Sequence, residues 1–222
     1  QALAREKMTA PLGHVLLYPT DLPGVVTVNM TNVLDIDGTQ SEDLTRAELV
    51  CRKQMFEVEA FLREYAPGYE HCYIIDSASL IGIRETRHFV GEKRLEREDI
   101  ETARFYEDWA VRGAQFNFDV HNISGAGLDE TGVQKHFKQR SGYTIPYGCL
   151  IPKGLKNVLL AGRCISGSHI AHSNFRAMPI CFGMGEAAGV AAALAVRDGT
   201  DVRDVDLAEL QAVLVGEPFR RR

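Results

Sequence analysis

The side chains best suited to chemistry lie at His169, His172 and Arg176, three and four residues apart. A histidine exchanges protons near neutral pH, and an arginine binds anions through paired hydrogen bonds. The spacing therefore predicts proton transfer or hydrogen bonding to a polar ligand, with histidines satisfied by backbone groups as the alternative. An H-x-x-H pair also occurs in metal sites, but no H-E-x-x-H pattern accompanies this one, and we expect no metal.

The segments on either side must position these side chains. Val158 to Ala161 is apolar throughout and typical of a buried parallel strand, and Gly162 follows it directly. Pro179 is typical of the first turn of a helix, where its missing N–H group is not needed. Since the start of a helix presents unpaired N–H groups, the loop and helix predict a site for an anionic or electron-rich ligand.

The helix expected from Pro179 carries three glycines, Gly183, Gly185 and Gly189. Each costs about 1 kcal/mol of helix stability relative to alanine, so something should pack against the helix backbone, either a sheet or a planar ligand. The spacing G-x-G-x-x-x-G lies inside the helix and is not the dinucleotide fingerprint, which needs its glycines in a strand-to-helix turn. The stretch from Ala177 to Val196 has one charge, Glu186, and small side chains, which favours a buried core helix over a membrane span.

A second charged group, Arg84, Glu85 and Arg87, lies in the sequence G-I-R-E-T-R. It is either a solvated charge cluster or a site in which Arg84, held by Glu85, binds a substrate carboxylate. Cys164 follows Gly162 and Arg163 and could be a reactive thiol, although a small packed residue is the interpretation that we favour.

The rest of the chain predicts a mixture of helices and strands. The patterns indicate three helices: Leu44 to Tyr65 with a Thr45/Glu48 capping box, Arg97–Arg104, and a last helix from Leu207 to Leu214 capped by Asp204 or Asp206. Strands are indicated at Val25–Met30, at Tyr73–Ile75, on both sides of a turn within Leu80–Val90, and, half-buried, through Phe116, Phe118 and Val120. A glycine-rich loop is expected at 124–132.

Composition limits the class of protein. The chain has 222 residues, 45% of them hydrophobic, and a net charge of -5, enough for a real core and without the clustered basic face of a nucleic-acid-binding protein. Its five cysteines form no C-x-x-C pair, so we expect a reducing compartment and a cytoplasmic protein. The chain begins with Gln1, and we expect it to be a piece of a longer product.

Three segments together resemble the C-terminal half of bacterial FAD-dependent oxidoreductases, in the glutathione-reductase-like class of flavoproteins. These are G-I-R-E-T-R, the run I-P-Y-G-C-L-I-P-K-G-L-K-N-V-L-L-A-G-R-C-I-S at 145–166, and the loop H-I-A-H-S-N-F-R-A-M-P-I-C. The similarity continues upstream through V-T-V-N-M-T and D-G-T-Q-S-E-D-L-T-R-A-E. Such proteins begin with a Rossmann unit carrying the glycine fingerprint, which this chain lacks.

The resemblance implies an α/β fold of mixed α+β character, the C-terminal portion of a two-domain FAD-binding flavoprotein in which helices pack on a mixed sheet. It implies a substrate-domain-like segment at 1–155, the end of the FAD-binding domain at 156–222, and hydride transfer between bound FAD and a small organic substrate. A fragment that folds without cofactor is the alternative, and this piece alone is expected to be inactive. The implied partners are the substrate and the missing N-terminal half, without nucleic acid or membrane, and homo-oligomers stay open.

The resemblance also implies roles for individual residues. We expect the cofactor to be lined by Ala161, Gly162, Arg163 and Ile165, and flavin N1 and O2 to be faced by the backbone at Met178, Pro179 and Ile180. The expected catalytic groups are His172 as proton acceptor, His169 beside it, and Arg176 and Arg84 to orient an anionic or hydroxylated substrate.

Overall fold

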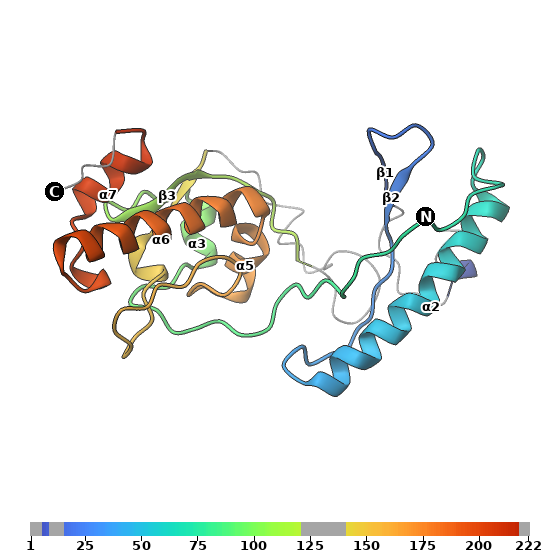
Figure 1. Cartoon of the computed structure of the whole chain (residues 1–222), viewed down its shortest axis with the longest axis horizontal. Helices are drawn as coiled ribbons and strands as arrows, with labels where there is room; N and C mark the ends of the chain where they lie inside the picture. Colours follow the sequence, from blue (N-terminus) through green and yellow to red (C-terminus); the bar gives the residue numbers. More distant parts are fainter. Residues whose placement is uncertain (1–5, 9–15, 121–140, 218–222) are drawn as a thin grey trace. The chain divides into compact units, whose positions relative to one another are not determined.

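The computed structural model describes residues 6–8, 16–120 and 141–217. Its contacts group the chain into two compact units, residues 1–86 with 121–131 and residues 87–120 with 132–222 (Figure 1). We call them the N-terminal and C-terminal units. The domain boundary that we predicted between residues 155 and 156 is a different one: it separates a substrate-domain-like segment from the end of the FAD-binding domain. It stays a prediction. The glycine-rich loop predicted at 124–132 lies outside the described residues.

The N-terminal unit is built from a hairpin and a long helix. Strands β1 (Leu16–Pro19) and β2 (Val26–Asn29) pair antiparallel, with Leu16 opposite Asn29. Helix α2 runs from Ser41 to Tyr65, so both the strand and the long helix predicted here are confirmed. The buried apolar residues of this unit's core cluster are few: Met8, Met30, Val58 and Leu62.

Helix α2 begins four residues earlier than Thr45, and the predicted Thr45/Glu48 capping box is wrong. The Thr45 hydroxyl instead donates a hydrogen bond to the Ser41 carbonyl inside the first turn. The N-cap residue is Gln40, which makes no side-chain cap. The chain just before α2 is held by Asp43, whose carboxylate accepts a hydrogen bond of 2.7 Å from the Asp37 N–H. This bond lowers the pKa of Asp43.

The strands predicted at Tyr73–Ile75 and within Leu80–Val90 do not form. Tyr73 is 74% exposed and Ile75 64%, so this run is neither buried nor part of a sheet. A β-propensity pattern needs a partner strand to become a strand, and this unit's only described sheet consists of β1 and β2.

The C-terminal unit holds a second hairpin sheet with helices on it. Strands β3 (Trp109–Ala114) and β4 (Tyr143–Pro146) pair antiparallel with two register shifts, and the short 3-10 helix η1 (Tyr147–Cys149) follows β4. The mixed sheet that we expected is wrong for the described residues, whose two sheets are both two-stranded and antiparallel. The broader expectation of mixed α and β structure is confirmed.

Helices cover and close this unit. Helix α6 (Met178–Asp198) packs on β3 and α7 (Leu207–Leu214), and contacts the 3-10 helix η2 (Val202–Asp204). Arg197, whose side chain is 7% exposed, forms ion pairs with Asp198 and with Glu209 of α7. Because a buried guanidinium needs such partners, these pairs fix α7 against the end of α6.

Three helices begin close to where the sequence predicts a helix start. Pro179 lies in the first turn of α6, and the Asp206 carboxylate caps α7 by accepting hydrogen bonds from the Ala208 and Glu209 N–H groups. Helix α3 (Arg97–Glu101) is shorter than predicted and starts with a capping box between Glu96 and Asp99. The prediction of helices at these three places is confirmed.

Two predicted strands of the C-terminal unit are absent from the described residues. Val158 to Ala161 has no strand pairing and is half-buried, although the Leu160 N–H donates to the Leu150 carbonyl at 2.9 Å. An apolar run becomes a parallel strand only beside a neighbouring strand, and no such neighbour lies there. Phe116 to Val120 is likewise irregular, and Phe118 is buried with 0% exposure.

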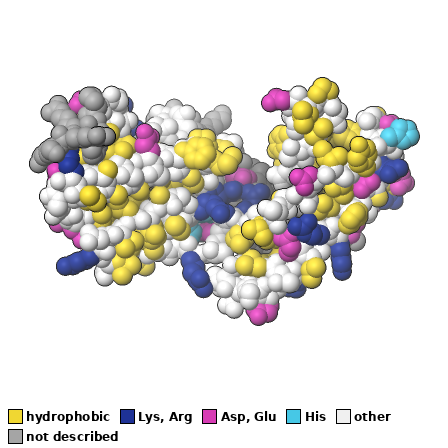
Figure 2. Space-filling model, viewed as in Figure 1, with side chains coloured by type: hydrophobic (Ala, Val, Ile, Leu, Met, Phe, Trp, Pro, Cys, Tyr) yellow, Lys and Arg dark blue, Asp and Glu magenta, His cyan; other side chains and the backbone are white. Residues whose placement is uncertain are grey.

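Helix α6 buries one face and leaves the other open. The buried residues include Ile180, Met184, Ala187, Ala191 and Leu194. We define the open face of α6 as its exposed apolar and small residues: Met178, Phe182, Gly185, Gly189, Ala192, Ala193 and Val196. Figure 2 shows hydrophobic side chains at the surface where α6 runs in Figure 1. The helix is therefore not enclosed on all sides, as a buried core helix would be.

Helix α6 is also the one helix in the described ranges that is long and apolar enough to cross a membrane. Only 33% of its most apolar window is buried within the chain. Glu186 is exposed next to the open face.

Candidate functional site

The segment that carries the predicted catalytic residues is helical where we expected a loop. Helix α5 runs from His169 to Phe175 and is capped by Ser168, whose hydroxyl accepts a hydrogen bond from the Ala171 N–H. Its inner side is anchored by Asn174, which accepts a 2.8 Å hydrogen bond from the Tyr143 hydroxyl and donates to the Phe116 carbonyl. The serine cap was a local signal that could have predicted this helix.

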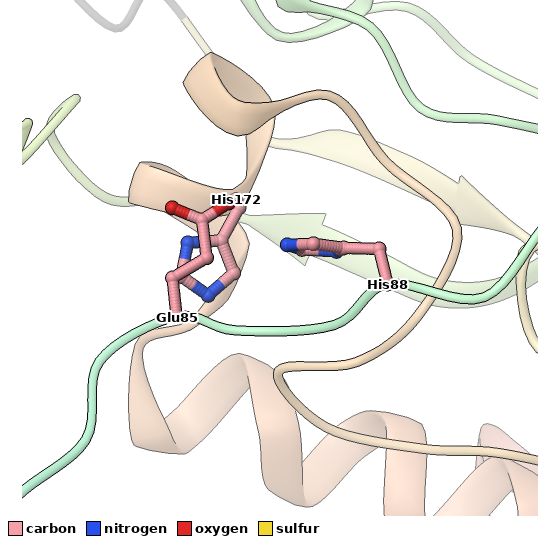
Figure 3. Close-up of side chains that lie close together, drawn as sticks. All are labelled: Glu85, His88 and His172. Carbon is pink, nitrogen blue, oxygen red and sulfur yellow. The ribbon is translucent and has the colours of Figure 1, made fainter. Parts of the chain in front are cut away.

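Helix α5 directs His172 into the protein, where it is 2% exposed. Its ring contacts two aromatic rings, with 5.0 Å between centroids and an angle of 89° to His88, and 5.5 Å and 90° to Phe175. Figure 3 shows the His88 ring beside the His172 ring, the latter on the α5 ribbon. Perpendicular stacking at these distances is favourable for aromatic pairs. Figure 3 also draws Glu85, which belongs to the N-terminal unit.

Sequence reasoning missed His88 as a site residue. Its Nδ1 lies 3.1 Å from the Ile165 carbonyl oxygen, and the next residue, Phe89, donates its N–H to the Cys164 carbonyl. His88 therefore lies directly on the loop that we expected to line the cofactor. The available signal was its place just after G-I-R-E-T-R, within a stretch that we took for strand and turn.

Arg176 is at the C-cap of α5 and forms an ion pair with the Asp119 carboxylate. The same guanidinium donates to the Asp119 carbonyl at 3.0 Å, and the arginine side chain is 15% exposed. These bonds tie the end of α5 to the segment before residue 121. The role that we expected for Arg176, orienting a substrate, stays a prediction and would have to share the guanidinium with Asp119.

The other two predicted catalytic residues, His169 and Arg84, are both exposed. His169 is exposed at the start of α5. The H-x-x-H spacing therefore leaves the first histidine exposed and the second, His172, buried. Arg84 is exposed and belongs to the N-terminal unit. Their catalytic roles and the expectation of no metal stay predictions.

The loop expected to line the cofactor is held by backbone bonds. Gly162 has a φ of 95°, a conformation that L side chains rarely adopt, so this position needs glycine. Ala161 is half-buried, Arg163 is exposed, and Ile165 is buried at 0% exposure. Ser166 continues the loop by donating its N–H to the Cys149 carbonyl. Of the predicted residues, Arg163 offers an exposed charge, whereas Ile165 offers its carbonyl to His88.

The start of α6 presents the groups expected to face the flavin. Met178 is 72% exposed, Pro179 is exposed, and Ile180 is 5% exposed. The N-cap residue, Ala177, makes no side-chain cap. The first-turn N–H groups therefore have no side-chain acceptor at the N-cap, and the helix dipole adds a partial positive charge at the same end.

Two cysteines, Cys181 and Cys164, lie near this helix start and contact backbone carbonyls. Burial raises the pKa of Cys181, and the nearby Arg163 opposes that rise. The Cys181 thiol donates weakly to the Phe175 and Arg176 carbonyls. Cys164 similarly contacts the Ala161 carbonyl at 3.7 Å. These contacts favour packed thiols over nucleophiles.

The electrostatics of the site thus combine three features. An uncapped helix start and the exposed Arg163 favour a negatively charged or electron-rich group, and a Cβ on Gly162, in the loop before α5, would meet nothing within 4 Å. A histidine pair, His88 and His172, contacts the end of the same loop. The residues present therefore fit a flavin ring that gains negative charge when reduced.

Comparison with known proteins agrees with this chemistry. Residues 2–214 match the family described as FAD dependent oxidoreductase. No curated protein matches the chain, and no solved structure does. Since the match covers nearly all of the 222 residues, the chain belongs to the FAD-dependent oxidoreductase family, and its cofactor is FAD.

Proposed function

We propose that this chain is the C-terminal part of a flavoenzyme of the glutathione-reductase-like class, which transfers a hydride between a small organic substrate and bound FAD. The observation that carries the proposal is the start of α6. There the first turn of α6, with Met178 exposed, has no side-chain cap, and Arg163 of the Gly162 loop is near enough to Cys181 to oppose the rise of its pKa. The flavin supplies the chemistry of accepting and returning the hydride.

The protein residues act by binding and by electrostatics. The N–H groups at the start of α6 and the guanidinium of Arg163 stabilise negative charge that develops on the ring, which favours reduction. Ala161, Gly162 and Ile165 shape the backbone next to it. In this proposal Arg176 and Arg84 orient the substrate, His169 lies at the edge of the site, and the His172 region exchanges the proton.

The open face of α6 supports a second part of the proposal, an N-terminal half that carries the Rossmann fingerprint. Gly185 and Gly189 would meet nothing within 4 Å if they carried a Cβ, so the packing that we expected against these glycines is not made by the described chain. Gly183 is different, since its Cβ would lie 3.4 Å from Val111. Among the described residues, the apolar run at 158–161 also lacks a neighbouring strand. Both features suit docking on a sheet outside these residues.

We also propose a cytoplasmic, bacterial protein in which α6 packs on protein rather than lipid. The described cysteines are all free thiols, which suits a reducing compartment. Glycine and alanine on the open face allow close approach of another backbone, and the exposed Glu186 is costly in a bilayer.

The test is cofactor binding by the 222-residue chain, alone and mixed with the N-terminal half from the full-length gene. We expect the visible absorbance of bound FAD only in the mixture, and bleaching of that absorbance when a substrate from a panel of sugars, hydroxy acids and amines is added. A mixture without flavin absorbance would contradict the proposal and favour a fragment that folds without cofactor.

Two matched variants localise the docking face. Ala193→Leu adds bulk on the open face of α6, whereas Ala208→Leu adds the same bulk at an exposed position of α7. We expect A193L to weaken association with the N-terminal half at least about tenfold, the loss from about 1.4 kcal/mol of overpacking. A208L should leave association unchanged. Equal affinities would show that the open face is not the docking surface.

A further inference from the structure

The outer side of α2 is apolar where a solvent-facing helix side is normally polar. Its inner side is marked by the buried residues of the helix: Ala47, Gln54, Val58 and Leu62. On the opposite side Leu49 is 58% exposed and Phe56 67%, and Ala60, one turn further on, is exposed as well. These three residues are seven and four positions apart, so they form one line along the helix. We call this line the outer stripe of α2.

Two ion pairs border the outer stripe on one side. Glu48 pairs with Arg52 at 2.7 Å, and Glu59 pairs with Arg63 at 3.5 Å. Each of the four lies one residue before or three residues after a residue of the stripe, which places all of them along the same edge. Their side chains are between 22% and 51% exposed. Along this edge the charge therefore alternates twice from negative to positive.

This order of charges fits a second copy of the same helix, provided that the copy runs antiparallel. A twofold axis near Phe56 brings position 48 of one helix opposite position 63 of the other, and position 52 opposite position 59. Every carboxylate then faces a guanidinium. The Phe56 rings of the two copies meet at the axis, and Leu49 packs on the aliphatic stem of Arg63. A parallel pair would set each charge opposite itself, which is unfavourable.

A groove at the same place is suited to the charge that the second helix brings. Its lining residues come from the stripe and from its surroundings: Phe56, Glu59, Ala60, Arg63, Glu64 and Glu70. Three of these side chains are carboxylates and one is a guanidinium, so the groove has a net negative charge. The antiparallel arrangement places Arg52 of the second copy opposite Glu59, at this groove.

We propose that the outer stripe of α2 is a self-association surface, at which two copies of this chain pair through antiparallel α2 helices with Phe56 at the twofold axis. The pairing is independent of the flavin, and it uses a different unit from the open face of α6, where we propose that the N-terminal half docks. The contact from residue 48 to residue 63 covers roughly 22 Å of helix. Such a small interface should give a weak dimer, with a dissociation constant in the micromolar range.

The first experiment measures the mass of the chain by sedimentation equilibrium over a range of concentrations. We expect a monomer–dimer equilibrium that Phe56→Lys weakens at least about tenfold, because the residue at the centre of the interface becomes charged. Phe105→Lys makes the same change at a phenylalanine of the C-terminal unit that is 60% exposed and should leave the equilibrium unchanged. A chain that stays monomeric would overturn the proposal. Equal effects of the two variants, or no effect of F56K, would do so too.

The second experiment tests the antiparallel arrangement by charge reversal. Arg63→Glu and Glu48→Arg are chosen because Arg52 also donates to the Ser77 hydroxyl and the Ala78 carbonyl. Each variant alone sets like charges across the axis and should lose self-association at least about tenfold. An equimolar mixture should form a heterodimer about as stable as the wild-type dimer, since the two acidic positions of one copy then face the two basic positions of the other.

The control for charge reversal is Arg97→Glu, which breaks an exposed ion pair with Glu101 in α3 and should dimerise like the wild type. Circular dichroism checks that every variant keeps its helix. Single variants that dimerise normally, or a mixture that stays monomeric, would overturn the proposal.

The same measurement on the mixture with the N-terminal half separates this proposal from the proposed function. We expect a complex with two copies of each partner. A complex with one copy of each would show that the N-terminal half covers the stripe, and would overturn the self-association. A chain that dimerises but binds neither the N-terminal half nor FAD would contradict the proposed function alone.

Discussion

The two units of the chain differ in how much apolar surface they bury. The C-terminal unit encloses large side chains completely, among them Leu95, Ile100, Phe118, Phe175 and Leu210. The core cluster of the N-terminal unit is small, and the unit leaves many apolar side chains exposed, including Leu22, Leu49, Phe56, Tyr73, Ile75 and Leu80. Since apolar burial is the main source of stability, the C-terminal unit should hold its loop and histidines in place by itself.

The largest test of this contrast replaces one phenylalanine in each unit. Phe175→Ala removes a ring with 0% exposure and should lower the free energy of unfolding by about 3–5 kcal/mol. Phe56→Ala removes a ring that is 67% exposed and should cost about 0.5 kcal/mol or less. Urea unfolding followed by tryptophan fluorescence measures the first cost, because the chain's single tryptophan is Trp109 of β3 in the C-terminal unit. Circular dichroism during urea unfolding measures the second, because Phe56 lies in α2. Similar costs for both variants would refute the contrast.

The next effect is loss of stability in alkali. Burial raises the pKa of Cys149 from 9.0 to about 12, and burial together with Asp99 raises that of Tyr106 from 10.0 to about 12. A group whose pKa is higher in the folded protein than in the unfolded one contributes its full stabilisation below the unfolded pKa and loses it as the pH rises toward the folded pKa. The free energy of unfolding should therefore fall between about pH 9 and 12. A fully unmatched proton changes it by about 1.4 kcal/mol per pH unit.

The Cys149→Ala variant isolates the thiol's share of that fall. Its free energy of unfolding, measured with urea at several pH values, should decline less steeply than that of the wild type between pH 9 and 10. The pKa values of Cys181 and Cys51 are also raised by burial, and these thiols contribute to the fall in both proteins. The comparison uses slopes, so the small cavity left by the substitution does not affect it. Parallel slopes would show that Cys149 is not responsible.

Glycine substitutions compare a packed position with an open one inside the C-terminal unit. A Cβ on Gly167 would lie 2.5 Å from Phe175 Cε1, and Gly167→Ala should cost about 1–3 kcal/mol by overpacking. Gly185→Ala meets open space and should stabilise the isolated chain by about 1 kcal/mol through helix propensity. Thermal unfolding of the two variants should therefore shift in opposite directions. A destabilised G185A chain would mean that this helix face is already covered.

The smallest expected effect compares the starts of two helices. Asp206→Ala removes the side-chain cap of α7 and should cost about 1 kcal/mol. Gln40→Asp gives α2 the cap that it lacks and should stabilise the N-terminal unit by about 0.5–1 kcal/mol. Circular dichroism during urea unfolding measures both, because α2 contributes most of the helix in its unit. A Q40D chain without gain would show that the Asp43 carboxylate already serves the helix start.

The sequence predicted elements whose signals are local. Pro179 and Asp206 mark helix starts by their own backbone and side-chain chemistry, and the periodic apolar residues before Pro67 mark α2, so these were found. Strands were predicted poorly because a strand exists only through its partner. Val158 to Ala161 has the composition of a parallel strand without a neighbour, whereas β3 went unnoticed although it pairs with β4.

The candidate site was predicted only in part for the same reason. The loop from Ala161 to Ile165 and the start of α6 could be placed from sequence because they are contiguous. The contact between His88 and Ile165 joins residues 77 positions apart, and no spacing rule connects them. Arg176 was named from its residue type, but its ion pair with Asp119, 57 positions away, is also long-range and gives it a structural role.

The carbonyl of Ile165 has a consequence for how this protein can vary. The partner that sets the tautomer of His88 is a main-chain atom, which every amino acid possesses. Related chains can therefore exchange the side chain at position 165 for another buried apolar one and keep the imidazole in the same protonation pattern. A proline at 166 would be different, because the Ser166 N–H bond to Cys149 that fixes this carbonyl would be lost.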